Sequence, residues 1–93
     1  MDSKEKTKKR PFIDEEINIG KDSFLILHND EINTFDFVID TLVEVCKHDS
    51  TQAEQCAWIT HHHGKCDVKK GNFNILKPLK DEIINRGLTV TIE

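Results

Sequence analysis

Two groups of polar residues in this sequence could take part in chemistry. Asn29 and Asp30 follow the apolar run 24–27 after one residue, His28, and three consecutive histidines occupy positions 61–63. Carboxylate and amide oxygens accept hydrogen bonds, and a neutral imidazole offers one further lone pair. A loop that carries such acceptors between two rigid elements is suited to binding a cationic group with N–H donors.

The histidine run His61, His62 and His63, with Cys66 close behind it, could also be read as a metal site. Adjacent residues of a helix point about 100° apart, so three in a row cannot all face one ion unless the helix unwinds. Zinc signatures instead contain pairs spaced as CxxC or HxxxH. We therefore predict no metal and no other cofactor, and expect one of these histidines to complete the acceptor site of Asn29 and Asp30.

The elements around the acceptor loop can be read from the spacing of apolar residues. The run 24–27 is too short for a helix and predicts a buried strand, after which the loop begins. Asn33 and Thr34 provide cap chemistry for a helix that starts at Phe35. Residues at helical spacing predict the core face of this helix: Phe35, Val38, Ile39, Leu42, Val45 and Cys46.

The remainder of the chain continues the same kind of pattern. A capping box at 51–54 opens a second helix, which Gly64 ends, and 65–70 alternates as a short strand. Pro78 falls in or near the first turn of a third helix, and 88–92 alternates as a last strand. The third helix has apolar positions at Ile75, Leu76, Leu79, Ile83 and Ile84. The order predicts an α+β fold, β-α-α-β-α-β, in which three helices cover one face of a three-stranded antiparallel sheet.

Composition sets the limits of this fold. The 93 residues, 37% of them hydrophobic, are enough for one domain over 22–93, behind a basic arm at 1–21 that we expect to be disordered. A net charge of −4 and the lack of a basic face exclude nucleic acid as the expected partner. The longest apolar run has four residues, so we expect no membrane span.

The cysteines and hydroxyl residues give no sign of catalysis. Cys46, Cys56 and Cys66 are an odd number without a CxxC pair, which predicts reduced thiols in a cytoplasmic protein. No serine or cysteine stands in a recognisable nucleophile motif with a base, so we expect a protein that is not an enzyme.

Several of these motifs together resemble the ClpS family of Clp protease adaptors. They are a strand followed by Asn29-Asp30, a helix that begins Phe-Asp-Phe-Val at Phe35, a helix that ends in His61-x-x-Gly64, and a last Gly-Leu-x-Val-x-Ile strand. The resemblance implies an adaptor that recognises N-degron proteins by a large hydrophobic first residue, Leu, Phe, Tyr or Trp. Such an adaptor delivers them to a AAA+ unfoldase of the ClpA or ClpC type. The alternative is a ClpS-fold module that binds peptides or metal without delivery to a protease.

The resemblance also implies roles for single residues. It places Asn29, Asp30 and His61 around the free α-amine of the substrate. It lines a hydrophobic side-chain pocket with Ile32, Phe35, Val38, Ala57, Thr60 and Leu88. The family usually has Thr and Pro where this chain has Asn33 and Thr34, and a Met at the position of Phe35. No unfoldase-docking residue is carried over, because the region after Gly64 is shorter than is usual in the family.

Overall fold

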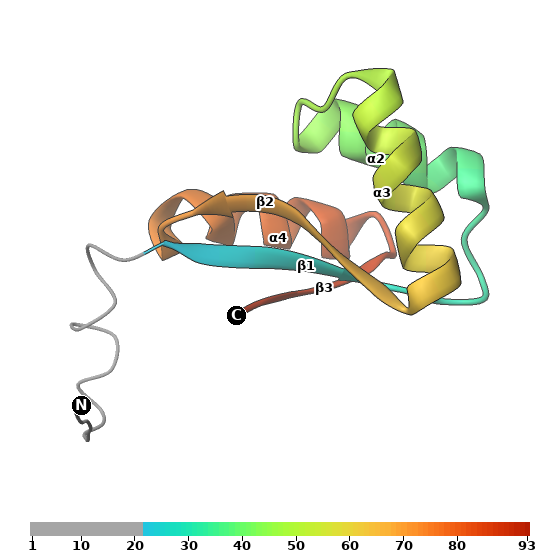
Figure 1. Cartoon of the computed structure of the whole chain (residues 1–93). Coiled ribbons are helices and arrows are strands. Elements are labelled where there is room, and N and C mark those ends of the chain that lie inside the picture. The colour runs from blue at the N-terminus through green and yellow to red at the C-terminus, as the bar shows by residue number, and fades with distance from the viewer. Residues whose placement is uncertain (1–21) are drawn as a thin grey trace.

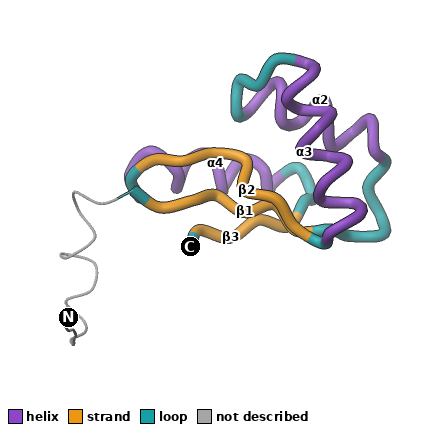
Figure 2. Tube along the Cα trace, viewed as in Figure 1, coloured by secondary structure: helices purple, strands orange, loops and turns teal. Residues whose placement is uncertain are grey.

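The computed structural model describes residues 22–93, so the predicted arm at 1–21 lies outside the described part of the chain (Figure 1). The elements follow the predicted order, and Figure 2 shows the helices, the strands and the loops that join them. The three strands form an antiparallel sheet in the order β2-β1-β3, which confirms the predicted fold class. The bounds are β1 Ser23–His28, α2 Phe35–Val45, α3 Ser50–His63, β2 Lys65–Gly71, α4 Phe73–Asn85 and β3 Thr89–Ile92.

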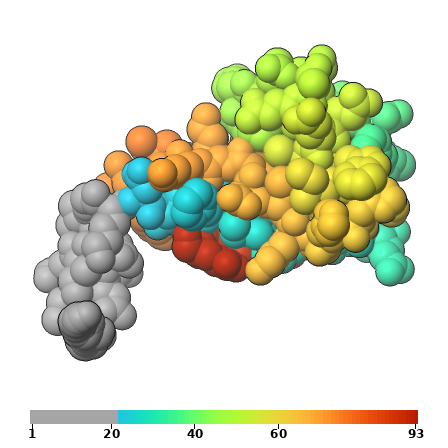
Figure 3. Space-filling view, viewed as in Figure 1, coloured from blue at the N-terminus to red at the C-terminus, as the bar shows by residue number. Residues whose placement is uncertain are grey.

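The central strand β1 is buried because it has a partner on each side and helices over one face. Leu25 and Leu27 point to the same face and are almost fully buried. Ile26 points to the opposite face and is 8% exposed, and atoms of β1 and β3 are visible at the molecular surface in Figure 3. The pairing of β1 with β2 shifts after Leu25, which lies opposite Lys69, while Ile26 lies opposite Asp67. Val68 is the extra residue of this bulge and is buried in the core.

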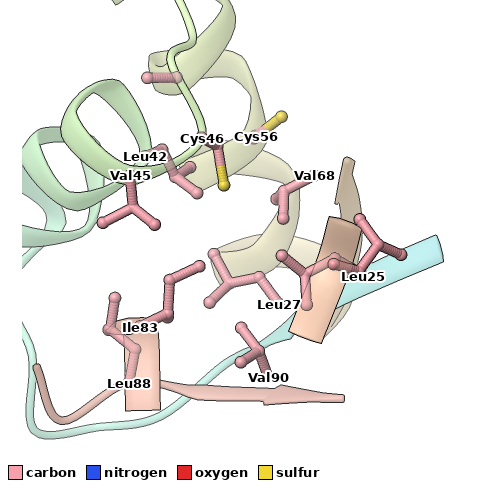
Figure 4. Close-up of a cluster of buried hydrophobic side chains, with 12 residues drawn as sticks. Leu25, Leu27, Leu42, Val45, Cys46, Cys56, Val68, Ile83, Leu88 and Val90 are labelled. Atoms are coloured by element: carbon pink, nitrogen blue, oxygen red, sulfur yellow. The ribbon is translucent and has the colours of Figure 1, made fainter. Parts of the chain in front are cut away.

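The core lies between the sheet and the helices. Helix α4 runs along the sheet, while α2 and α3 pack against one another near the end of β1 (Figure 1). Figure 4 shows that Leu42 and Val45 of α2 share one cluster with Leu27 and Ile83. Burying a side chain of this size contributes roughly 1.5 to 3 kcal/mol. This cluster therefore fixes α2 and α3 relative to the sheet.

The helix ends agree with the predictions at some positions and differ at others. The Thr34 side chain accepts a hydrogen bond from the Phe37 backbone N–H (3.0 Å), as expected of an N-cap. Gly64, with φ of 94°, ends α3 in the left-handed region that favours glycine. The predicted capping box at 51–54 is wrong, because α3 begins earlier. Its N-cap is Asp49, whose side chain accepts from the Gln52 N–H (2.8 Å).

Helix α4 also begins earlier than its apolar spacing predicted. Asn72 is the N-cap, and its side chain accepts a hydrogen bond from the Ile75 N–H (3.1 Å). Pro78 therefore lies in the second turn of α4. Only in the first turn does a backbone N–H have no partner within the helix, so the N–H that Pro78 lacks would otherwise have been able to donate a helical hydrogen bond. Ile75 and Ile84, two of the apolar positions that predicted this helix, are 54% and 46% exposed and do not belong to the core. The face of α4 that meets the sheet is narrower than the apolar pattern suggested.

Candidate functional site

A pocket of about 440 Å³ lies where the loop after β1, helices α2 and α3, and the turn before β3 come together. Three segments that are far apart in the sequence contribute to its wall: 27–38, 57–61 and Leu88. The lining residues are Leu27, His28, Asn29, Asp30, Glu31, Asn33, Phe35, Val38, Ala57, Thr60, His61 and Leu88. The pocket therefore combines the polar loop and the apolar positions that the sequence had singled out.

Asp30 supplies a fixed negative charge at the polar end of the pocket. One carboxylate oxygen, Oδ1, accepts hydrogen bonds from the backbone N–H groups of Ile32 and Asn33, each at 2.8 Å. The other oxygen, Oδ2, accepts from the side-chain amide of Asn33 at 3.0 Å. Burial alone would raise the pKa of Asp30, but these hydrogen bonds outweigh burial and hold the pKa below its ordinary value. The carboxylate is thus ionised at neutral pH.

A backbone hydrogen bond joins the loop to the end of α3. The Asn29 N–H donates to the Gly64 carbonyl oxygen at 2.9 Å, which brings the loop close to the last turn of that helix. His61, in that last turn, lines the pocket. His62 instead packs on Trp58, with ring centroids 4.1 Å apart. Of the three consecutive histidines, only His61 belongs to the pocket wall.

The other end of the pocket is apolar. Phe35 and Val38 come from α2, Ala57 and Thr60 from α3, and Leu88 precedes β3. The Thr60 hydroxyl donates to the Cys56 carbonyl oxygen (2.8 Å). Its hydrogen-bonding capacity is used within the helix, so Thr60 does not require a polar partner from a ligand.

The structure brings together every residue that the sequence assigned to this site except Ile32. That side chain is 90% exposed and is not part of the pocket wall. The backbone N–H groups of Ile32 and Asn33 donate to the Asp30 side chain and form a turn. In this turn the Ile32 side chain faces solvent. The assignment of Ile32 to the pocket was therefore wrong.

The sequence reasoning also missed four residues of the wall: Leu27, His28, Glu31 and Asn33. Two of them, His28 and Glu31, adjoin Asn29 and Asp30 in the sequence, so a wider reading of the loop could have found them. His28 forms a hydrogen bond with the Thr91 hydroxyl (2.8 Å) across the sheet, which no local pattern indicates. Asn33 was read only as a helix cap, whereas its side chain points to Asp30.

The cysteines do not line the pocket. All three are free, and burial is the main cause that raises the pKa of the Cys46 thiol to about 11 and that of Cys66 to about 12.

Within residues 22–93, no group of three or more His, Cys, Asp or Glu residues is placed to hold a metal ion. No helix in this part of the chain is both long and apolar enough to cross a membrane.

Fold and pocket together define a small α+β binding module with an ionised carboxylate beside an apolar cavity. The sequence model of the ATP-dependent Clp protease adaptor protein ClpS matches residues 21–91. The chain therefore belongs to the ClpS family of protease adaptors. Its structure is similar to that of Agrobacterium tumefaciens ClpS2 bound to L-phenylalaninamide, with a TM-score of 0.75 and 22% identity. That match covers 78% of this chain and 95% of ClpS2. No curated protein is significantly similar in sequence.

Proposed function

We propose that this chain binds the first residue of N-degron substrates and delivers them to a ClpA- or ClpC-type AAA+ unfoldase. The free α-amine of the substrate binds to Asn29, Asp30 and His61. The first side chain, Leu, Phe, Tyr or Trp, enters the apolar end of the pocket. The chain acts by binding, and not as an enzyme.

The observation that carries this proposal is the ionised Asp30 carboxylate at the polar end of a pocket of about 440 Å³ whose other end is apolar. The volume falls within the roughly 300 to 1,000 Å³ of typical small-ligand sites. A protonated α-amine has three N–H donors, so it matches a carboxylate, an amide oxygen and a neutral imidazole. An acetylated or internal peptide nitrogen has neither the charge nor these donors. A pocket of this design would therefore read a free N-terminus.

The ligand of the similar ClpS2 structure supports the same assignment. L-phenylalaninamide has a free α-amine, an aromatic side chain and an uncharged amide in place of a carboxylate. These are the features of the first residue of a peptide. Phe35, Val38 and Leu88 offer this chain an apolar wall against which such a ring would be buried.

A peptide titration tests the binding step. Peptides that differ only in their first residue would be compared with free and with acetylated N-termini. We expect the free-amine Leu and Phe peptides to bind, and acetylation to weaken binding by at least about tenfold, since a hydrogen bond to a charged group contributes roughly 1.5 to 3 kcal/mol. Equal affinity for the two forms would contradict the proposal.

A degradation assay tests the delivery step. Delivery requires that an unfoldase take hold of the adaptor or of its substrate, and we propose that the segment 1–21 takes part in this. Removing residues 1–18 should leave peptide affinity unchanged and abolish degradation of a Leu-first substrate by the unfoldase and its protease. A full-length chain that binds peptide but never promotes degradation would favour the alternative, a peptide-binding module without delivery.

A further inference from the structure

The side chain of Asn33 joins the two ends of the pocket. Its amide nitrogen Nδ2 donates to the Asp30 Oδ2 atom at 3.0 Å and to the Gly87 carbonyl oxygen at 3.0 Å. A primary amide has two N–H donors, so both donors of Asn33 are engaged. Because both partners are acceptors, the nitrogen of this amide must be the atom that faces them.

The hydrogen bonds on Asp30 limit where it can accept a further donor. A carboxylate has about four lone-pair positions. Backbone N–H groups of Ile32 and Asn33 occupy two on Oδ1, and the Asn33 amide occupies one on Oδ2. One position on Oδ2 remains. Asn33 thus fixes the rotation of the carboxylate and leaves a single acceptor direction for a ligand.

The second contact of Asn33 reaches a distant part of the chain. Gly87, with φ of 97°, forms the turn between α4 and β3, and the next residue, Leu88, lines the apolar end of the pocket. Asn33 and Gly87 are 54 residues apart in the sequence. One amide group therefore ties the carboxylate that faces the ligand amine to the segment that holds an apolar wall residue.

From this geometry we propose that Asn33 is the positioning residue of the amine site. It holds the Asp30 carboxylate in the direction that accepts an α-ammonium group, and it fixes that carboxylate at a set distance from the Leu88 wall. This inference rests on the proposed binding of a free N-terminal residue. It adds that the affinity for the amine depends on a residue that does not itself need to touch the ligand.

A double-mutant cycle with Asp30 tests this role. Affinities for a Leu-first peptide would be measured for the unmodified chain, Asn33→Ala, Asp30→Asn and the double variant. We expect Asn33→Ala to weaken binding of the free-amine peptide about tenfold. In the Asp30→Asn background the same change should have less than about a twofold effect, because the carboxylate on which Asn33 acts has gone.

Two further variants separate positioning from general support of the fold. Asn33→Ser retains one donor instead of two, and we expect an intermediate loss of about threefold. Glu44→Ala is the control for general support of the fold. It removes the hydrogen bond that Arg86, the residue before Gly87, donates to the Glu44 carboxylate, and this contact does not involve Asp30. Glu44→Ala should leave the affinity within twofold of the unmodified chain. Thermal denaturation of each variant establishes that it is folded.

The outcomes are distinct. Unchanged affinity in Asn33→Ala, or an equal loss with and without Asp30, would overturn the positioning role while leaving the proposed function intact. If Asn33→Ala does not fold, Asn33→Ser decides: affinity equal to that of the unmodified chain overturns the inference, and a loss that vanishes in the Asp30→Asn background supports it. If the unmodified chain binds free-amine and acetylated peptides equally, the proposed function fails, and the inference fails with it.

Discussion

Replacing Asp30 with Asn removes the charge of the amine site while preserving most of its shape. The retained amide oxygen can still accept the Ile32 and Asn33 backbone N–H groups, which lie at 2.8 Å in the structure. The new NH₂ group would face the Asn33 amide nitrogen, which is also a donor, so the hydrogen bond that Oδ2 accepts at 3.0 Å would be lost while the two backbone contacts remain. The loop turn should therefore survive, while the acceptor offered to a ligand is replaced by a donor.

The loss of affinity follows from this exchange. A hydrogen bond to a charged group contributes roughly 1.5 to 3 kcal/mol, and here the counter-charge of the ammonium group is lost with it. We expect a loss of about 2 kcal/mol or more, which corresponds to a roughly 30-fold or greater increase in Kd. Binding of an acetylated peptide should change much less, because that peptide has no charge for Asp30 to neutralise.

Fluorescence anisotropy with a labelled Leu-first peptide at pH 7 measures this change. Asp40→Asn is the matched control, since Asp40 is an exposed acid on α2 that does not line the pocket. The control removes the same formal charge from the surface and should alter Kd by less than twofold. If Asp30→Asn binds within threefold of the unmodified chain, Asp30 is not the counter-charge. Glu31, the other carboxylate in the pocket wall, would then be examined.

Three further predictions concern specificity, pH and the thiols. Phe35 lines the apolar end of the pocket, and we expect its ring to restrict the entry of β-branched side chains. In a peptide titration, peptides beginning with Ile or Val should bind at least about tenfold more weakly than one beginning with Leu, a difference of roughly 1.4 kcal/mol. Equal binding would show that Phe35 does not restrict entry. Since the pKa of Asp30 lies below its ordinary value, its carboxylate remains charged at neutral pH, and the contribution of Asp30 to binding should be lost only as the pH falls through that lowered pKa, as Kd measured against pH in Asp30→Asn and the unmodified chain would show. On the alkaline side Kd should rise above about pH 8 as the ligand amine loses its proton. With a pKa of about 12, Cys66 is about one part in ten thousand thiolate at pH 8. Its alkylation by iodoacetamide, followed by mass spectrometry, should therefore be slow until the protein is unfolded, and fast labelling of the native chain would contradict this.

The order of the elements could be predicted because each has a clear local signal. The apolar run of β1 and the apolar stripe of α2 around Leu42 differ in period, and Gly64 and Gly87 mark turns that require positive φ. The start of α4 could not be predicted from apolar spacing. Its first turn holds an exposed Phe73 and is set by the Asn72 cap, so the helix extends before the first core residue.

Most residues of the pocket could be predicted from the sequence, but the hydrogen bonds that hold them in place could not. Motif resemblance named Asp30 and His61, and the structure lines one pocket with both. It could not reveal the bond from Asn33 to Gly87, because a contact between residues 54 positions apart leaves no periodic signal. It also misplaced Ile32, because the direction of a loop side chain depends on the hydrogen bonds of the turn rather than on residue type.

The two long-range bonds of the loop explain how so short a segment can form a defined binding site. Asn29 donates to the Gly64 carbonyl at the end of α3, and Asn33 donates to the Gly87 carbonyl before β3. The loop is thus held on both sides by backbone of elements that the core already fixes. A loop ordered before binding loses little conformational entropy when a ligand arrives, so more of the interaction energy appears as affinity. The proposed recognition of a single terminal residue, which offers few contacts, would benefit from a loop that is ordered before the ligand binds.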